Sequence, residues 1–411
     1  MAALNTHLTT TEGLAPEVQT YYDRKMLKDM KPKLVHYQYG QKRPIPRGGG
    51  KTINFRKWTP FAAITTPLAE GVVPDGQNLS MTEITATVAQ YGGYVAISDL
   101  LDMTAIDPVA SDAVELMADQ GGLSVDTVIR DELHQGTGVQ YAGGGDYRFE
   151  VGKTDILSTT ELRRAVRTLK NNNAKPFLRN GKEYFIAIVS PDTTYDLQSD
   201  PLWQDVSKYQ DKEAIYTGEI GRIFGVILVE TPQARSFSAA NLTAASRTLT
   251  VAAWNNATQT LTVDEAITES EAAALIGRDL LISDEGETGK PQYLAAILSA
   301  NAGAAGAASL ELAQNQAELG VTPADGDVLY PGEAGRSGAA LASTLVFGRN
   351  AYGVVDIESG ANVKTILKPA GSAGSSDPLD QISTVGWKVE GFAARILQQT
   401  WMIRIESGFS D

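Results

Sequence analysis

Three histidines are the residues of this sequence best suited to acid–base or metal chemistry, because imidazole titrates near neutral pH and binds metals. They are His7, His36 and His134, and they lie far apart in the chain. No His-Glu-x-x-His or other paired ligand spacing connects them. We interpret each as an ordinary surface or packed residue. The chain also contains no cysteine, which excludes disulfides, thiolate catalysis and cysteine-based zinc or iron–sulfur sites.

The segment Gly50-Lys51-Thr52 resembles the end of a phosphate-binding P-loop. That motif also needs a glycine five residues before Gly50, between a strand and a helix. Position 45 is isoleucine, and no strand-to-helix pattern surrounds the segment. The sequence also lacks the Gly-x-Ser-x-Gly motif and a Gly-x-Gly-x-x-Gly motif that follows a strand. We therefore predict neither a P-loop nor a serine nucleophile.

One acidic cluster, Asp284, Glu285 and Glu287, could bind calcium weakly. Its spacing does not match an EF-hand loop, so a solvated acidic turn is the favoured interpretation. A pair of carboxylates for glycoside hydrolysis stays open, because spatial pairing is not readable from the sequence, but no feature supports it. The sequence thus predicts no catalytic residue, no cofactor and no metal, and we expect a protein that is not an enzyme.

The charge of the chain is unevenly distributed around a net value of −14. Residues 1–57 hold eleven basic and four acidic residues, whereas residues 236–340 hold four basic and thirteen acidic ones. An acidic chain argues against a dedicated nucleic-acid binder. The basic N-terminal arm is either a solvated tail or a segment that lies across an acidic partner, most simply another copy of the chain.

The composition fits a folded protein in an aqueous compartment, with 43% hydrophobic and 20% charged residues over 411 positions. This length suggests two or three domains. The N-terminus lacks the basic start and apolar core of a signal peptide. The longest apolar runs, such as residues 185–189, are far shorter than the ~20 residues that span a bilayer.

Residues 236–340 differ from the rest in composition, with alanine at 25 of 105 positions. Short alternating stretches separated by turn residues predict a small β-sandwich or barrel. These stretches begin at Thr248, Thr260, Asp279, Tyr293 and Ser309. The flanking sequence reads like one interrupted domain, so we predict an insertion domain.

Two alternating runs before residue 90 predict a long two-stranded arm. One run includes Thr52-Ile-Asn-Phe55, the other is residues 80–88, and residues 68–76 between them are rich in turn formers. An isolated hairpin buries too little surface to be stable. We therefore expect this arm to lie on a neighbour.

Periodic apolar residues predict helices and strands in the remaining chain. Asp107-Pro108 opens a helix that extends to about residue 135, with Gly121-Gly122 marking either a kink or a close backbone approach. Further helices begin after Ser158 and Ser190. Strands are predicted at residues 184–189, 223–230, 382–390 and 399–405. Alternating helices and strands indicate an α/β or α+β layer domain.

The order of these parts resembles that of the major capsid proteins of tailed bacteriophages, with the fold typified by phage Hong Kong 97. One group of these proteins has an N-terminus in the style of Leu8-Thr-Thr-Thr-Glu-Gly-Leu14 followed by Tyr21-Tyr-Asp-Arg24. The resemblance covers about residues 1–235 and 341–411, outside the insertion. The resemblance also depends on the basic arm and on four short segments. These segments are Glu70-Gly71, Ala96-Ile-Ser-Asp-Leu-Leu-Asp102, Tyr216-Thr-Gly-Glu-Ile-Gly-Arg-Ile-Phe-Gly-Val226 and Leu345-Val-Phe-Gly348.

The resemblance implies an α+β capsid fold with a mainly β insertion domain at residues 236–340. It implies an N-terminal arm and an extended E-loop hairpin that reaches over a neighbouring subunit, at residues 1–45 and 46–95. It further implies a peripheral domain with a spine helix at about residues 107–135, and an axial domain around hexamer and pentamer centres. The peripheral domain would comprise residues 96–152 and 376–411, and the axial domain residues 153–235 and 341–375.

The function implied is that of a structural subunit that self-assembles into an icosahedral capsid enclosing double-stranded DNA. Its partners would be other copies of itself, a separate scaffold protein, a portal and a decoration protein, in a virion assembled in the host cytoplasm. Alternatives are the shell of an encapsulin-like compartment and, with less support, a carbohydrate-active or adhesin protein. Deleting residues 1–45 is expected to stop assembly and leave the core folded. Candidate assembly-interface residues are Arg24, Lys25, Lys28, Arg43, Arg47, Lys51, Lys57, Glu70, Gly71, Glu219 and Arg222.

Overall fold

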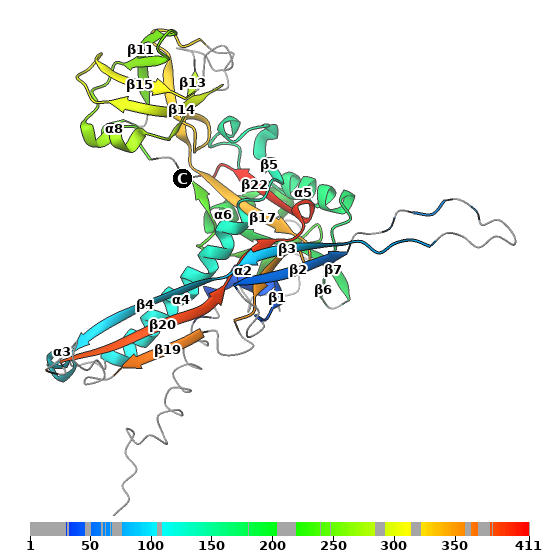
Figure 1. Ribbon diagram of the computed structural model, residues 1–411. Helices are drawn as coiled ribbons and strands as arrows, with labels where there is room; N and C mark the ends of the chain where they lie inside the picture. The colour runs from blue at the N-terminus through cyan, green and yellow to red at the C-terminus, as the bar shows by residue number, and fades with distance from the viewer. Residues whose placement is uncertain are drawn as a thin grey trace, which may run out of the picture. The chain divides into compact units, whose positions relative to one another are not determined.

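The computed structural model divides the chain into two compact units, one of residues 1–136 and 349–399 and one of residues 137–348 and 400–411. Both units mix helices and strands (Figure 1). The residues that the structure describes are 30, 33–45, 51–58, 61, 63–65, 67, 76–104, 109–179, 181–203, 219–238, 240–246, 248–283, 292–313, 322–357, 363–368, 379 and 381–410.

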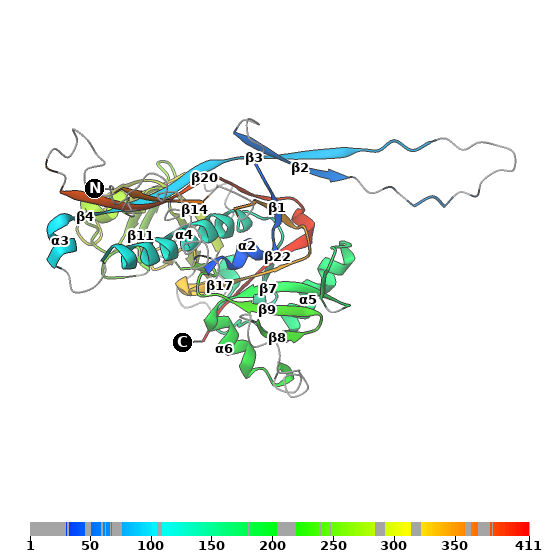
Figure 2. The same cartoon turned by 90° about the horizontal axis from the view of Figure 1, so that it is seen from below.

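The first unit is built on the long helix α4 (Val109–Leu133) and an antiparallel sheet of β19 (Val363–Lys368), β20 (Ile382–Phe392) and β4 (Ala89–Ser98). Figure 2 shows α4 running along this sheet. Side chains alternate across a strand, so one face of the sheet meets the helix. Ile97 and Val385 pack there with Val114 of α4, and the indole nitrogen of Trp387 donates to Gln120 Oε1 at 3.0 Å.

The paired glycines of α4 lie at a close approach of another backbone segment, within a helix that continues through both of them. A Cβ on Gly122 would lie 3.1 Å from the carbonyl oxygen of Met30, and one on Gly121 would lie 3.3 Å from the Met30 side chain. Met30 is fully buried. The start of α4 at Asp107 and Pro108, predicted from the sequence, lies outside the described residues.

A short helix, α2 (Val35–Tyr39), is anchored on α4 by buried contacts between His36 and Asp126. The backbone N–H of His36 donates to Asp126 Oδ1 at 2.8 Å, and His36 Nδ1 lies 2.7 Å from Oδ2. Both side chains are almost completely buried. Because Met30, Leu34 and Tyr37 are buried, a deletion of residues 1–45 would remove core side chains, which argues against our expectation that it spares the core.

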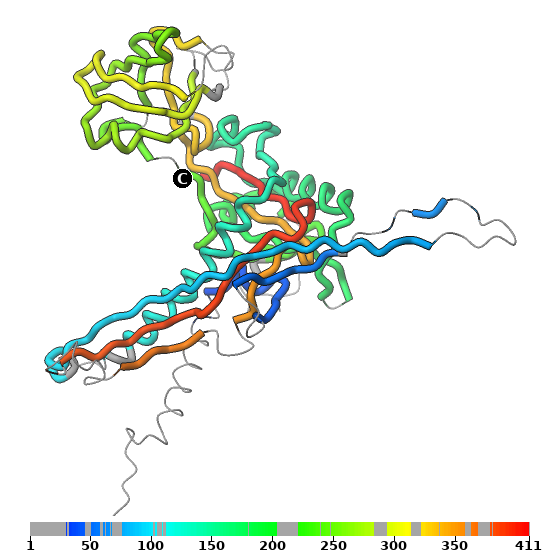
Figure 3. The backbone as a smooth tube through the Cα atoms, viewed as in Figure 1, coloured from blue at the N-terminus to red at the C-terminus, as the bar shows by residue number. Residues whose placement is uncertain are grey.

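Two smaller sheets complete the first unit. β1 (Gln41–Arg43), β18 (Tyr352–Val355) and β21 (Ala394–Ile396) form one, with β1 and β18 parallel. β2 (Thr52–Trp58) and β3 (Met81–Thr87) pair antiparallel, which confirms the predicted hairpin. A short helix, α3 (Asp99–Thr104), follows β4. Figure 3 shows β4 beside β20, two strands far apart in the sequence.

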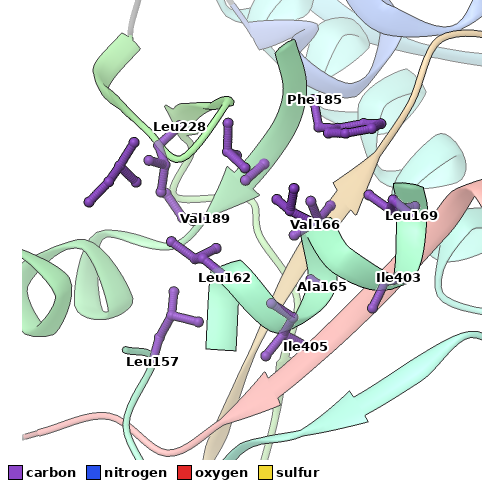
Figure 4. Packing of buried hydrophobic residues seen from close by; sticks show 14 of the residues in the cluster. Leu157, Leu162, Ala165, Val166, Leu169, Phe185, Val189, Leu228, Ile403 and Ile405 are labelled. Atoms are coloured by element: carbon purple, nitrogen blue, oxygen red, sulfur yellow. The ribbon is translucent and has the colours of Figure 1, made fainter. Parts of the chain in front are cut away.

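The second unit contains a sheet whose main path is β5 (Val139–Tyr141), β22 (Met402–Ser407), β17 (Leu341–Phe347), β7 (Lys182–Val189), β9 (Val226–Glu230) and β8 (Glu219–Ile223). β6 (Phe177–Arg179) pairs with β7, and β10 (Ser236–Phe237) pairs with β17. Helix α5 (Thr159–Asn171) buries Leu162, Val166 and Leu169 with residues of this sheet (Figure 4). Ser158 and Ser190 cap α5 and α6 (Pro191–Ser199), as predicted.

The described part of the insertion contains a closed barrel, in agreement with the predicted small β-sandwich or barrel, whereas its separation as a domain stays a prediction. Its strands, in barrel order, are β11 (Leu249–Asn255), β12 (Thr260–Val263), β15 (Ala308–Leu312), β14 (Gln292–Asn301), β13 (Asp279–Ser283) and β16 (Val328–Pro331). Helix α8 (Glu269–Leu275) and strand β16 are elements that the sequence analysis missed. Short 3-10 helices lie at residues 142–144, 148–150, 336–338 and 399–401.

Three boundaries differ from the sequence-based expectation. Residues 223–230 are not one strand, because Phe224 and Gly225 adopt positive φ and turn β8 into β9. Strand β22 does not join the spine helix; it is buried along its whole length between β5 and β17. Strands β18 and β19, expected in the axial domain, belong to the unit that contains α4.

Candidate assembly surfaces

The predicted interface residues do not form one cluster in the part of the chain that the structure describes. Arg24, Lys25, Lys28, Arg47, Glu70 and Gly71 lie outside it, and Glu219 begins β8 with a side chain that is not described. Arg43, Lys51 and Lys57 belong to the first unit, whereas Arg222 belongs to the second. Arg222 lies over the Tyr184 ring at 5.5 Å. Their role in assembly stays a prediction.

The hairpin of β2 and β3 has one buried face near its base. Ile53 and Phe55 alternate inward on β2, and Ala86 does so on β3. The Phe55 ring lies so close to Gly353 of β18 that a Cβ there would be 2.4 Å from it. Only glycine fits at that position, so the base of the hairpin is firmly seated within its own unit.

The described residues farther along the hairpin expose apolar side chains. Met81 at the end of β3 is 44% exposed and Leu79 before it is 71% exposed. Phe61 and Ile64, which follow β2 in the sequence, are exposed as well. Exposed large apolar side chains can mark an interaction site when they gather on one surface. We call these four residues the hairpin patch.

A second apolar surface lies on the face of the β4–β20–β19 sheet that points away from α4. Even-numbered positions of the three strands face outward, and they form a groove of about 740 Å³. Tyr94 is 75% exposed, and Ile366 and Ile382 contribute the other large apolar side chains. Lys368 and Lys388 also line this groove, which we call the outer groove.

Glycines make the floor of the outer groove. Gly92 lies opposite Lys388, and Gly386 lies opposite Tyr94 in the register of β4 and β20. A Cβ on Gly92 would lie 2.7 Å from the Trp387 carbonyl oxygen. Because these positions lack side chains, another polypeptide can approach the backbone of the sheet closely.

The apolar surface continues at the end of the sheet in helix α3. Leu100, Leu101 and Met103 are all exposed, Met103 to 78%. The backbone N–H of Asp99, where α3 begins, donates to the Gln381 carbonyl beside β20, which places α3 next to Ile382. Sequence analysis missed Tyr94, Ile366 and Ile382 as surface residues. Alternation at positions 89–98 was the available signal, but a strand there was not recognised.

The most strongly charged buried cluster of the second unit has a structural explanation. Arg148 contacts the buried Glu406 carboxylate through Nε at 2.6 Å and Nη2 at 2.8 Å, and Arg404 Nε donates to it at 2.8 Å. Burial lowers the pKa of Arg404, and the neighbouring charge of Arg148 adds to this effect. For Arg148, the hydrogen bonds and charge of Glu406 outweigh burial and raise the pKa. Both arginines stay charged, so the cluster holds elements together and offers no acid or base near neutral pH.

Two of the three histidines have contacts within the fold that account for them. His36 is paired with Asp126, and His134 Nδ1 contacts the Arg130 carbonyl oxygen one helical turn earlier. His7 and the acidic residues at 284–287 lie outside the described residues. Within the described ranges, no group of three or more histidine, aspartate or glutamate side chains is arranged to hold a metal ion. Over the same part of the chain, no helix is long and apolar enough to cross a membrane.

Comparison with known proteins defines the class to which this arrangement belongs. Two solved structures share the fold. One is the capsid of Ralstonia phage GP4, at 12% identity and a TM-score of 0.57, covering 91% of this chain and 88% of that one. The other is the cyanophage Pam1 capsid, at 12% identity and a TM-score of 0.52, covering 88% of this chain and 85% of that one. The chain therefore has the phage capsid fold, and the predicted fold class is confirmed.

The sequence itself points to the same class. Residues 110–282 match the model of a family described as phage capsid protein. No curated protein matches the sequence. The matched segment and the fold together support the resemblance of this chain to phage capsid proteins.

Proposed function

We propose that the chain is the shell subunit of an icosahedral tailed-phage capsid, assembling as hexamers and pentamers around packaged double-stranded DNA. The observation that carries this proposal is that one chain presents two apolar surfaces it leaves exposed, the hairpin patch and the outer groove. A structural role in the virion fits a chain that leaves two apolar surfaces uncovered, since exposed apolar surfaces mark interaction sites.

The two surfaces support a contact between different patches of neighbouring copies. In such a heterologous contact, the hairpin patch of one copy would lie in the outer groove of the next. Contacts of this type close into rings when the rotation between copies fits a whole number of subunits. Met81 and Leu79 would then bury apolar area against Tyr94 and Ile382, at roughly 25 cal/mol for each Å² removed from water.

The parts of the chain receive their proposed roles from the same comparison. Residues 1–45 would act as the N-terminal arm and residues 46–95 as the E-loop. In this proposal the sheet of β19, β20 and β4 with α4 would form a peripheral domain, and the sheet that contains β7 and β17 would form an axial domain. Further partners would be a scaffold protein, a portal and a decoration protein, with assembly in the host cytoplasm.

The test is electron microscopy of the full chain expressed together with the scaffold protein. Closed icosahedral particles of uniform size are the expected result. A second preparation in which residues 1–29 are deleted retains the buried Met30 and α2, and it should form few or irregular particles. Monodisperse monomers from the undeleted chain would refute the shell function, and normal particles from the deleted chain would refute the role of the arm.

The contents of the particles separate this function from that of an encapsulin-like compartment. A phage shell filled in its host contains nuclease-protected double-stranded DNA, whereas a cellular compartment contains a cargo protein. Purification of filled particles followed by nuclease treatment and DNA extraction distinguishes the two. Protected DNA of uniform length supports the phage shell, and an enclosed enzyme without DNA would overturn it.

A further inference from the structure

Helix α5 carries a row of positive charge that its fold does not need. Arg163, Arg167 and Lys170 are exposed and lie within about 60° of one another around the helix axis, given 3.6 residues per turn. The opposite face of the helix is buried in the core of the second unit. We call these three residues the α5 stripe.

The surroundings of the α5 stripe add positive charge and little negative charge. Arg164 lies beside the stripe on the helix surface, and its Nη1 is 3.7 Å from Glu161 Oε2. The Arg163 guanidinium lies over the Phe224 ring at 5.3 Å, which fixes its position without neutralising it. Lys175, beyond the end of α5, is also exposed. A chain with a net charge of −14 thus concentrates cations on one helix face.

Two polyanions could meet such a face, a second copy of this acidic chain or a nucleic acid. A stable contact between protein copies needs an apolar centre that excludes water. The described outward positions of α5 include no exposed large hydrophobic residue, and the neighbouring Phe224, which is 40% exposed, lies under the Arg163 guanidinium. Phosphate contacts need no apolar centre, because their affinity comes from the release of counterions. The composition of the face therefore favours the nucleic acid.

We propose that the α5 stripe binds the phosphate backbone of the double-stranded DNA that the shell encloses, which rests on the proposed function. The stripe spans about 10 Å of helix, and the same length of duplex carries roughly six phosphate charges. Two of its three residues are arginines, whose planar guanidinium groups bind phosphate oxygens in pairs. Because the stripe offers only three phosphate contacts on an otherwise acidic subunit, it binds DNA weakly and without sequence preference.

The experiment measures binding of the full-length, unassembled chain to a fluorescent 30-base-pair duplex of random sequence at several salt concentrations. The variant R167Q/K170Q removes two charges from the stripe and keeps good helix formers. The control K153Q/R395Q likewise removes one lysine and one arginine charge, from exposed positions outside the proposed arm, E-loop and outer groove. Between about 50 and 200 mM salt, the loss of affinity should be about tenfold smaller for R167Q/K170Q than for the unsubstituted chain. The control should behave like the unsubstituted chain.

Particle formation is measured on the same proteins, so that each result has one meaning. Normal particles together with a reduced salt dependence in R167Q/K170Q support DNA binding by the stripe. Loss of particles with unchanged DNA binding would overturn the proposal and assign the stripe to a contact between copies. Equal DNA binding by all three proteins, or none at low salt, would also overturn it. Failure of the unsubstituted chain to form particles would refute the shell function without affecting the binding result.

Discussion

The insertion barrel and the sheet that carries the outer groove differ in two respects: how many of their strands are paired on both sides, and how completely their apolar side chains are buried. In the barrel, six strands pair in a closed circle and surround a buried core that includes Leu249, Leu280 and Leu310. In the sheet of β19, β20 and β4, only the central strand has a partner on each side within the described residues. One face of that sheet exposes Tyr94 and Ile382.

Under the proposed function, this difference indicates which part of the chain is fully stable before assembly and which part gains stability from contacts with neighbouring copies. Closing a barrel removes the sheet edges that otherwise invite pairing with another chain. The open sheet keeps both its edges and an apolar face, so its most stable state is one in which a partner covers them. We infer that the barrel folds without neighbours, whereas the hairpin and the outer groove contribute fully to stability only in the shell.

The sharpest test of this contrast separates the two regions physically. A fragment of residues 240–334 should fold alone, because Arg278 joins its two ends by bonds to the Ala240 carbonyl at 2.7 Å and the Glu333 carboxylate at 3.2 Å. It should give dispersed amide NMR signals and one cooperative thermal transition. A peptide that carries only β2 and β3 should show neither, since an isolated two-stranded hairpin is marginal in water.

If the fragment lacks dispersed amide signals at all temperatures, the barrel does not fold independently, and the difference between the two regions is refuted. In that case the barrel depends on the rest of its unit. The complementary variant joins Phe237 to Leu341, which are directly paired between β10 and β17, through a short glycine-containing turn. This variant should keep the far-ultraviolet circular dichroism expected for a folded chain, and a fully unfolded spectrum would argue against an independent insertion.

A matched pair of alanine substitutions is expected to have opposite consequences in the two regions. Leu310→Ala empties a fully buried site of the barrel core and should cost about 2–5 kcal/mol. For a domain of this size, that lowers the melting temperature of the isolated barrel by at least about 8 °C. Tyr94→Ala removes a side chain that is 75% exposed and should change the stability of the unassembled chain by less than about 0.5 kcal/mol.

The same pair should reverse its order when assembly is measured. Sedimentation of particles should show a marked loss of shells for Tyr94→Ala, because its ring would no longer be buried under a neighbour. Shells of Leu310→Ala should form at temperatures below the barrel transition. If Tyr94→Ala lowers stability and leaves particle yield unchanged, the outer groove is not an interface between copies.

Much of the fold was predictable because its signals are local. The hairpin of β2 and β3, the caps at Ser158 and Ser190, and strands β12 and β13 all follow from alternation or capping patterns in short windows. Membership of a sheet is not local. Strand β22 alternates like a half-buried strand, and only its pairing with β17 and β5 reveals that both of its faces are covered.

The candidate surfaces were less predictable than the fold, again for a physical reason. The outer groove combines β4 with β20 and β19, segments that meet only in the folded chain. An exposed tyrosine such as Tyr94 looks the same in sequence as a buried one. The basic residues of α5 share one exposed face, and only the structure shows that the opposite face of the helix is buried in the core.

The smallest expected effect concerns the pH dependence of the barrel and tests whether it is stabilised from within. Glu271 accepts hydrogen bonds from the backbone N–H groups of Ala244 and Thr268, which lowers its pKa from 4.5 to about 2. A lowered carboxyl pKa adds stability above the pKa of the unfolded chain, and this stability is lost as the pH falls from 4.5 towards 2. Glu271→Gln should therefore lower the melting temperature of the fragment near neutral pH and flatten its decline below pH 4.5. Glu269→Gln removes the same charge from the same helical turn and should retain the steep decline, whereas equal curves for both variants would show that the cap of α8 contributes nothing specific.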